Sequence, residues 1–346
     1  MKRILITGGA GFIGSHTSLA LLEKGFDLVI LDSLVNSKID VIENIKKITS
    51  LKNKNLKNKI EFFKADLRDK DCIYDIFKKA KSELRSIDAV IHFAGLKAVA
   101  ESVENPFKYW DVNVKGSLNL FSVMEMFECK TIVFSSSATV YGKSNKFYLS
   151  EDDAINPINP YGKTKATIEN ILSDIFKGTS RNWRIANLRY FNPVGAHPSG
   201  LIGEDPIGVP NNIFPIINLV AKGKQEVLKI YGNDWETRDG TCLRDYIHVM
   251  DVANGHIKTL EYLLHFDETF INMNLGTGKA TSVMELVNIF QEVNKVKLPF
   301  KVVERRKGDL SICVADNSLI REKLAWFPER NLAEMCRDSW NRSLCN

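Results

Sequence analysis

The sequence has no long apolar run and no paired cysteine motif. None of its hydrophobic stretches approaches the ~18 residues that a membrane helix needs. Only the apolar residues 4–6 follow Lys2 and Arg3, too few for a secretory signal peptide. The six cysteines are scattered, without a Cys-x-x-Cys pair or the spacing of metal ligands. We therefore expect a cytoplasmic protein of a reducing compartment, with no membrane partner and no bound metal.

A strong excess of one charge is lacking as well. The net charge is +5, with 44% hydrophobic and 26% charged residues, an ordinary globular composition that gives no indication of nucleic-acid binding. The local exception is the segment 46–59, which holds six lysines and no acid. Such a run is typical of a solvated loop or helix end, and a weak polyanion patch is the alternative.

What the sequence does have is a regular alternation of short apolar runs and helical patterns. Strands are predicted at 4–6, 28–31, 60–64, 89–91, 131–134 and 184–188. Helices are predicted at 13–23, 72–80, 109–127 and 161–176. Continuous apolar strands separated by helices indicate a parallel sheet covered on both faces. The predicted fold class is α/β, a doubly wound parallel sheet of the Rossmann type.

The pattern changes after residue 190. Five prolines between positions 193 and 215 interrupt a stretch rich in glycine and asparagine. Regular elements then return, with helices predicted at 216–222, 250–264 and 282–293 and strands at 228–231 and 300–303. We expect residues 1–190 to form the cofactor domain and residues 191–346 a smaller mixed α/β substrate domain, with an interleaved boundary. The smaller part should lie at the carboxyl ends of the strands, where open α/β sheets bind ligands.

A glycine-rich turn joins the first predicted strand to the first helix. Gly8, Gly11 and Gly14 allow a tight turn, a close approach of the backbone to a diphosphate, and close packing of the helix on the sheet. Asp32 ends the second strand, 18 residues beyond Gly14. A carboxylate there accepts hydrogen bonds from ribose hydroxyls and repels a 2′-phosphate, so the pattern predicts NAD rather than NADP. Asp66 ends the third strand, where it would meet the adenine edge or, equally, cap a helix.

A tyrosine and a lysine lie four residues apart on one predicted helix. Tyr161 is a poor base at its usual pKa of about 10. The ammonium of Lys165 and the positive nicotinamide ring would lower that pKa, although the motif alone is common. Upstream, Ser135, Ser136 and Ser137 follow a buried strand, where a hydroxyl can hydrogen-bond a reacting sugar oxygen. Spacing does not separate the three serines, and a turn-forming serine is the alternative.

Together these residues resemble the extended short-chain dehydrogenase/reductase superfamily. Three further blocks resemble the UDP-glucose 4-epimerases: IHFAGLKAV at 91–99, LRYFNPVGAHPSG at 188–200 and RDYIHVMD at 244–251. The resemblance extends from residue 1 to roughly residue 330. It implies interconversion of UDP-glucose and UDP-galactose through a 4-keto intermediate, with NAD as the cofactor. It also implies a homodimer, in which the helices at 109–127 and 161–176 would pair; the alternative is that their apolar faces pack only inward.

The resemblance assigns roles residue by residue. Tyr161 would remove the proton of the sugar 4-hydroxyl, Ser137 would be its hydrogen-bond partner, and Lys165 would hold the nicotinamide ribose. NAD would be bound by Gly8, Gly11, Phe12, Ile13, Gly14, Asp32, Asn36, Ser37, Asp66, Leu67, Phe93, Ala94, Gly95, Lys97, Asn113, Ser135, Tyr161, Lys165 and Phe191. The UDP-sugar would be bound by Lys97, Ser137, Tyr161, Tyr190, Asn192, Asn211, Asn212, Ile213, Tyr231, Arg244, Tyr246, Arg306, Asp309 and Cys313.

Two positions depart from the family pattern. Ser33 follows Asp32 where the pattern usually has asparagine, which should weaken one adenosine contact without changing the choice of cofactor. Cys313 stands where members restricted to glucose and galactose often carry tyrosine. A small residue there would enlarge the pocket beside the sugar 2-position, so UDP-N-acetylglucosamine and UDP-N-acetylgalactosamine are expected to fit as well. The alternative is that Cys313 is simply a small core residue.

Three other functions share parts of this pattern. A sugar-nucleotide 4,6-dehydratase commonly has an Asp-Glu pair directly after the catalytic serine, where this chain has Ala138 and Thr139. A net oxidoreductase would exchange its NAD with solution. A non-catalytic NAD-binding regulator would typically lack the tyrosine or the lysine, and this chain keeps both. The 4-epimerase is therefore the expected function.

Overall fold

The computed structural model describes residues 2–52, 60–178, 182–208, 210–306 and 308–345. Its main layer is a seven-stranded parallel sheet with the strand order β12-β7-β5-β4-β1-β2-β3. These strands are β1 (Arg3–Thr7), β2 (Asp27–Asp32), β3 (Ile60–Lys64), β4 (Ala89–His92), β5 (Thr131–Ser137), β7 (Arg184–Tyr190) and β12 (Thr269–Leu275). The order reverses between β1 and β4, which is the point where such sheets bind ligands.

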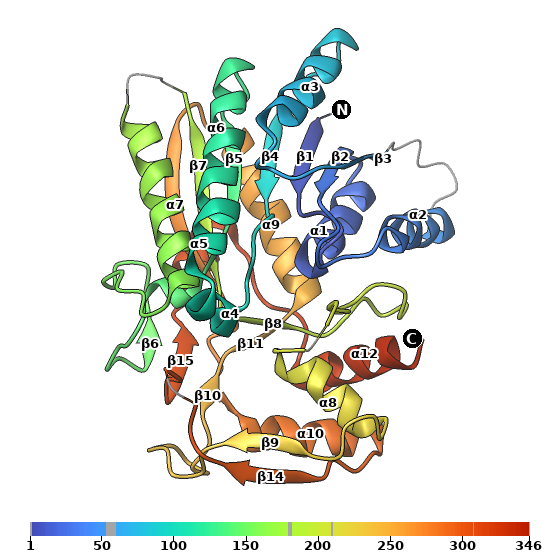
Figure 1. Cartoon of the computed structure of the whole chain (residues 1–346), viewed down its shortest axis with the longest axis vertical. Helices are drawn as coiled ribbons and strands as arrows, with labels where there is room; N and C mark the ends of the chain where they lie inside the picture. The colour runs from blue at the N-terminus through green and yellow to red at the C-terminus, as the bar shows by residue number, and fades with distance from the viewer. Residues whose placement is uncertain (1, 53–59, 179–181, 209, 307, 346) are drawn as a thin grey trace.

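Helices cover both faces of this sheet (Figure 1). One face packs against α1 (Phe12–Glu23), α2 (Asp40–Lys52), α9 (Val249–Leu264) and α11 (Ser318–Leu324). The other face packs against α3 (Lys70–Ser82), α6 (Gly116–Met126) and α7 (Pro160–Lys177). Alternation along each strand divides the two cores, since Ile4 and Ile6 of β1 join the first and Leu5 joins the second. The predicted doubly wound α/β fold is confirmed.

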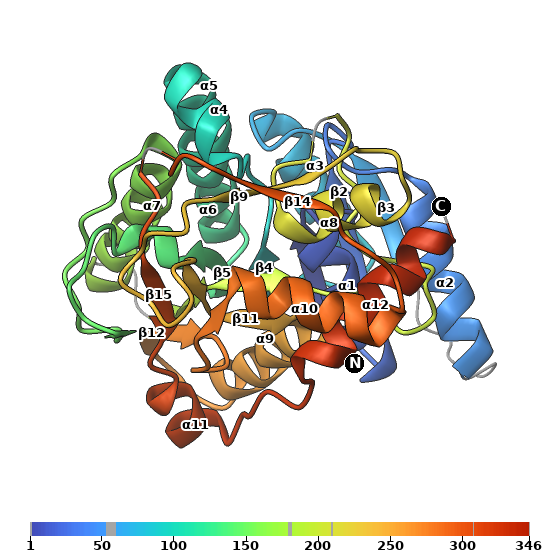
Figure 2. The same cartoon turned by 90° about the horizontal axis from the view of Figure 1, so that it is seen from below.

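A smaller region lies at the carboxyl ends of the strands (Figure 1). It holds a mixed sheet of β13 (Thr281–Ser282), β10 (Leu243–Arg244), β15 (Ile312–Ala315) and β6 (Tyr148–Leu149). Two strand pairs join it: β8 (Asn192–Val194) with β11 (Tyr246–His248), and β9 (Leu228–Tyr231) with β14 (Phe300–Val303). A separate core lies between α8 (Ile213–Ala221), α10 (Val283–Asn294) and α12 (Leu332–Leu344), which Figure 2 shows side by side.

The chain crosses between the two regions more than once. β12 and α9 follow residue 190 and yet pack in the main layer, whereas β6 precedes residue 190 and pairs with β15 of the smaller sheet. The division at residue 190 therefore stays a prediction, with crossings on both sides of it.

The helix expected at 109–127 is confirmed, with an earlier start and a change of winding: helical backbone continues without a break through α5 (Pro106–Tyr109), a π-helical segment (Trp110–Lys115) and α6. A separate short helix, α4 (Val99–Glu104), precedes it. The π-helical segment carries Asn113, a predicted cofactor residue, and such segments often mark functional sites. The basic segment 46–59 begins as the end of α2, and its residues 53–59 lie outside the described part of the chain.

The described residues lack two kinds of feature. No helix among them is long and apolar enough to cross a membrane. In the same part of the chain, no group of three His, Cys, Asp or Glu side chains is placed to hold a metal ion.

Candidate active site

The glycine turn after β1 closes tightly against the loop that follows β4. Gly8 has a φ of +70°, and a side chain there would place its Cβ 2.7 Å from the Ala94 nitrogen. A Cβ on Gly14 would clash with the Gly8 carbonyl oxygen. Gly11 precedes α1, whose fully described first turn has no acidic residue and no side-chain cap. The amide groups there, including those of the predicted residues at 12–14, suit the diphosphate of a dinucleotide.

Asp32 is held rigidly beside this turn. It is buried, and its carboxylate accepts hydrogen bonds from the Ala10 N–H (3.0 Å), the Leu34 N–H (2.9 Å) and the Ser37 hydroxyl (2.8 Å). Two carboxylate oxygens offer about four lone-pair sites, so acceptor capacity remains for a ribose hydroxyl. The predicted residue Ser37 therefore orients Asp32.

Two predicted adenosine contacts are engaged within the protein. Both oxygens of Asp66 accept from the guanidinium of Arg68 (3.1 and 2.7 Å), which lowers the pKa of Asp66. The N-cap of α3 is Asp69, so the helix-cap alternative for Asp66 is wrong. Asn36 accepts from the Ile207 N–H (3.1 Å), in the loop before α8.

The predicted catalytic residues come together at the end of β5. Tyr161 lies in the first turn of α7 and is hydrogen-bonded to Ser137, the last residue of β5. Lys165 follows one helical turn later, buried, and donates to the Ser135 carbonyl (2.7 Å). Its ammonium lies 4.8 Å from the centroid of the Phe134 ring and 6.0 Å from that of Tyr161. Ser137 is the serine whose side chain acts on the pKa of Tyr161, which supports the expected pairing.

Burial dominates the ionisation of this pair. It raises the pKa of Tyr161, and the hydrogen bond with Ser137 offsets part of the rise. Burial lowers the pKa of Lys165 to about 8, against the opposing charge of Glu169. The predicted lowering of the tyrosine pKa, which also invoked the nicotinamide charge, therefore stays a prediction.

The loop after β4 is braced from the π-helical segment. Asn113 is buried, and its side chain accepts from the Leu96 N–H (2.8 Å) and donates to the Leu96 carbonyl and to Thr164 (both 3.1 Å). Its carboxamide oxygen would lie 3.1 Å from a Cβ on Gly95. Asn113 thus shapes the 93–97 loop beside the glycine turn. Leu67, another predicted contact, packs at the start of α6.

His92, at the end of β4, is a structural histidine. Its ring nitrogens lie 2.6 Å from the Thr7 hydroxyl and 2.8 Å from the Ser117 hydroxyl. Burial lowers its pKa to about 3, so the ring stays neutral.

Three charged side chains predicted to hold the UDP group gather around the thiol of Cys242. Arg244, Arg306 and Asp309 all act electrostatically on this thiol. Arg306 donates to Asp309 (2.9 Å), and its guanidinium lies 4.5 Å from the centroid of the Tyr231 ring. Guanidinium groups beside an aromatic ring suit a diphosphate joined to a base.

The strand pair β8 and β11 brings other predicted substrate residues together. Asn192 and Tyr246 are register partners, directly after β7. Phe191 packs with the cluster around Ala138, next to Ser137. Tyr190 lies deeper: it is buried, and its hydroxyl is hydrogen-bonded to His256 in the core.

A glutamate that the sequence did not indicate bridges the two sides of the site. Glu204 accepts from Lys97 of the cofactor side (2.9 Å) and from Asn212 of the substrate side (2.5 Å). Asn211 and Asn212 are exposed and directly precede Ile213, the first residue of α8. Lys97 lies 107 positions from Glu204 in the sequence, so no local pattern could have identified this link.

Cys313 lies in β15 as the register partner of Arg244. It packs against the cluster that includes Ala138 and Phe191, so it faces the region of Ser137. Burial raises the pKa of its thiol to about 11, which keeps it protonated and unreactive at neutral pH.

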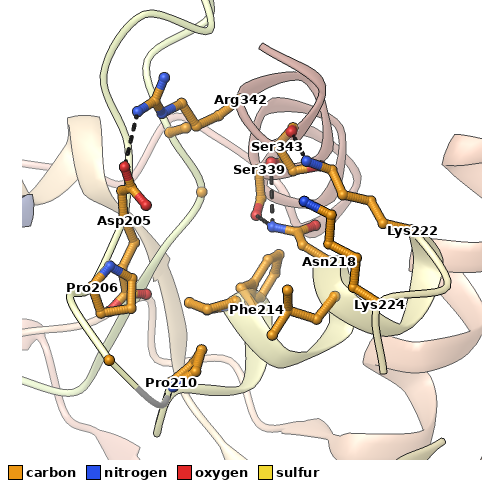
Figure 3. A pocket seen from close by; sticks show the side chains of 16 residues that line it. Asp205, Pro206, Pro210, Phe214, Asn218, Lys222, Lys224, Ser339, Arg342 and Ser343 are labelled. Carbon is orange, nitrogen blue, oxygen red and sulfur yellow. Dashed lines mark hydrogen bonds and ion pairs between the residues drawn. The ribbon is translucent and has the colours of Figure 1, made fainter. Parts of the chain in front are cut away.

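A cavity of about 250 Å³ borders this site at Glu204 and lies between α8, α12 and residues 204–208 (Figure 3). Lys222 donates to the Ser343 carbonyl at the end of α12, and Arg342 pairs with Asp205 (3.6 Å). Lys222 lies at the carboxyl end of α8 and Arg342 at the carboxyl end of α12. The dipole at a helix carboxyl end disfavours a bound anion. The cavity is therefore not assigned to the active site.

The doubly wound sheet, the glycine turn and the Ser137–Tyr161–Lys165 group define an extended short-chain dehydrogenase/reductase. A family model described as GDP-mannose 4,6 dehydratase matches residues 5–339. The bifunctional UDP-glucose 4-epimerase and UDP-xylose 4-epimerase 1 of Pisum sativum is 47% identical over 98% of this chain and 95% of that protein. The UDP-glucose 4-epimerase of Bacillus subtilis is also 47% identical, over 97% and 95%.

Solved structures agree with these relatives. The UDP-glucose-4-epimerase of Stenotrophomonas maltophila, with bound NAD and formylated UDP-arabinopyranose, superposes with a TM-score of 0.93 at 42% identity, covering 100% of this chain and 98% of that one. The chain belongs to the family of UDP-glucose 4-epimerases, as the sequence blocks had indicated.

Proposed function

We propose that this chain is an NAD-dependent UDP-glucose 4-epimerase that interconverts UDP-glucose and UDP-galactose. The observation that carries the proposal is the Ser137–Tyr161–Lys165 group, placed beside a glycine turn that fits a dinucleotide. NAD, when bound there, supplies the oxidation of sugar C4 and its later reduction. The names of the relatives, and the NAD in their structures, support this assignment.

The residues of the chain divide the work. Tyr161 accepts the proton of the sugar 4-hydroxyl, and the Ser137 hydroxyl orients the tyrosine oxygen and the sugar 4-oxygen. The ammonium of Lys165 stabilises the phenolate. Arg244 and Arg306 hold the remote UDP group, so the sugar can turn over in the pocket while its binding energy positions the reacting centre.

Replacing Tyr161 by phenylalanine tests the proposal. The variant should lose about 10²–10⁴-fold in kcat for conversion of UDP-galactose to UDP-glucose, because the general base is gone. Tyr148→Phe, at a half-exposed tyrosine outside the site, is the matched control and should keep full activity. A Tyr161→Phe protein that epimerises at the wild-type rate would sink the assignment.

We further propose that the N-acetylated UDP-sugars are substrates. The argument is the small thiol of Cys313, which packs with the cluster behind Ser137. The family resemblance implies that restricted members often carry a bulky tyrosine at this position. Cys313 is also the register partner of Arg244, a residue predicted to hold the UDP group, and this supports the proposal.

Cys313→Tyr measures the role of this position. Turnover of UDP-N-acetylglucosamine should fall at least tenfold, with UDP-glucose turnover changed less than threefold, because one excess acetamido group must clash with the ring. Cys345→Ser, at an exposed cysteine, is the control. Equal losses for both sugars, or no turnover of N-acetyl sugars by the wild type, would refute this part.

Dehydration of the sugar is disfavoured. Thr139 donates to the Ser137 hydroxyl (3.0 Å), and Ala138 packs in a hydrophobic cluster. These two positions offer neither a carboxylic acid nor a carboxylate for the elimination of water.

We also propose that two copies of the chain associate through α4, α5 and α6. Apolar side chains at helical spacing are exposed along this edge: Val103, Phe107, Trp110 and Leu118. Figure 2 shows α4 and α5 at the edge of the molecule. An exposed apolar stripe of this kind is typical of an interface.

A further inference from the structure

A buried carboxylate lies one helical turn beyond Lys165. Glu169 is only 6% exposed, and both of its oxygens are used. Oε1 accepts from the Ser136 hydroxyl and from Arg189 Nε (3.0 Å), and Oε2 accepts from Arg189 Nη2 (2.7 Å). The bidentate pair with Arg189 satisfies a charge that would otherwise be costly to bury.

These contacts join three elements at the level of the catalytic residues. Tyr161, Lys165 and Glu169 lie at positions i, i+4 and i+8 of α7, on one face of the helix. Ser136 of β5 and Arg189 of β7 are register partners in adjacent strands. Glu169 therefore fixes α7 to the strand end that carries the reacting serine.

Arg189 is itself fixed from the far side. Its Nη1 donates to the Tyr141 hydroxyl (3.0 Å) and to the Glu151 carbonyl (3.1 Å). The Glu151 carboxylate accepts from the Asn274 N–H (2.6 Å), and Tyr141 donates to the Asn274 side chain (2.6 Å). The hydrogen bonds therefore run without a break from Glu169 through Arg189 to Glu151. Glu151, at the far end of this network, serves as a control for Glu169.

The charged and titratable groups that face the Tyr161–Lys165 pair come from several elements. Glu169 faces Lys165 from α7, with Arg189 of β7 behind it, and His92 faces Lys165 from β4. Tyr109 of α5 and Tyr190 of β7 face Tyr161. Among these groups Glu169 is the carboxylate that opposes the loss of the lysine proton.

We propose that Glu169 is a positioning residue of the reaction, which holds Lys165 charged and fixes the Ser136–Ser137 strand end. It touches neither the sugar nor the cofactor and acts through its neighbours. The inference rests on the proposed epimerase function.

A change in pH dependence follows from the charge. Burial brings the pKa of Lys165 to about 8, and the Glu169 carboxylate raises it. Loss of that carboxylate lowers the lysine pKa further. Lys165 then loses its proton at lower pH, and activity that needs the ammonium declines from a lower pH.

The experiment compares pH profiles of kcat for UDP-galactose between wild type, E169Q, E169D and E151Q. In E169Q the midpoint of the alkaline decline should move down by about one pH unit, with KM within twofold, because a one-unit shift is typical for a neighbouring charge. E169D keeps the charge and should restore the wild-type midpoint. E151Q changes a carboxylate of the same network away from Lys165 and should leave the midpoint unmoved.

The outcomes distinguish a failure of the proposed epimerase function from a failure of the proposed role of Glu169. An inactive wild type contradicts the proposed function, whereas an active wild type with the same midpoint in E169Q overturns the inference. If E169Q does not fold, S136A tests the inference instead, because it removes only the hydrogen bond from the Ser136 hydroxyl to Glu169. The inference requires at least a threefold lower kcat there with an unchanged KM and an unmoved midpoint, and an unchanged kcat overturns it.

Discussion

Burial keeps three histidines of this chain uncharged at neutral pH. Burial lowers the pKa of His16 to about 3, of His92 to about 3 and of His256 to about 4. In the unfolded chain each ring binds a proton below a pH of about 6.5. The native state does not bind these protons until the pH is much lower. Stability is therefore complete above pH 6.5 and falls as the pH drops toward 4.

His256→Asn isolates one of these protons. Between pH 6 and 4.5 the slope of the free energy of unfolding against pH should become shallower by about 1.4 kcal/mol per pH unit. This is the slope that the uptake of one proton on unfolding contributes. Urea unfolding at several pH values measures it. His265→Asn removes an exposed histidine and is the control. An unchanged slope in His256→Asn would show that this ring is protonated in the fold.

Single residues were predicted unevenly from the sequence. Tyr161, Lys165 and Asp32 carry local signatures, since helix spacing and a strand end define their places. Glu169 and Glu204 carry none, because their partners lie in other elements: Ser136 is 33 positions from Glu169, and Lys97 is 107 from Glu204. Buried ion pairs depend on the assembled fold, which a local pattern does not contain.

At the scale of elements, apolar strands were predictable and polar ones were not. β1, β3 and β9 agree with their expected ranges within one or two residues. The edge strand β12 was missed because Asn272 and Asn274 interrupt its apolar pattern. Asn274 is nevertheless fully buried, and it donates to the Leu149 carbonyl (2.7 Å), 125 positions away. Such satisfied polar groups hide a strand from a reading of periodicity.

The helical edge formed by α4, α5 and α6 carries the prediction of a dimer. Phe107→Asp should give a particle near the chain mass of 39.1 kDa, where the wild type should have about twice that mass, because a charge in a desolvated interface is costly. Light scattering after size exclusion measures it. Leu51→Asp places the same charge at an exposed leucine on α2 and should keep the wild-type mass. A monomeric wild type would contradict the proposed interface.

At the scale of the whole molecule, the glycine turn and the arginine pair belong to different regions of the fold. The turn belongs to the main sheet, and Arg244 and Arg306 belong to the smaller region at its carboxyl ends. The chain reaches this arrangement by crossing between the regions, through β6 in one direction and through α9 and β12 in the other. In the proposed function a dinucleotide and a nucleotide sugar would meet at Tyr161, the arrangement that an internal oxidation and reduction requires.

In the proposed reaction the cofactor stays in the site and is restored within each turnover. This can be measured by incubating purified protein with UDP-galactose, without added NAD, and resolving the nucleotide sugars over time. We expect conversion to an equilibrium mixture with UDP-glucose over many turnovers, with about one NAD per chain released on denaturation. A requirement for added NAD in proportion to product, or a 4-keto-6-deoxy sugar as the product, would contradict it.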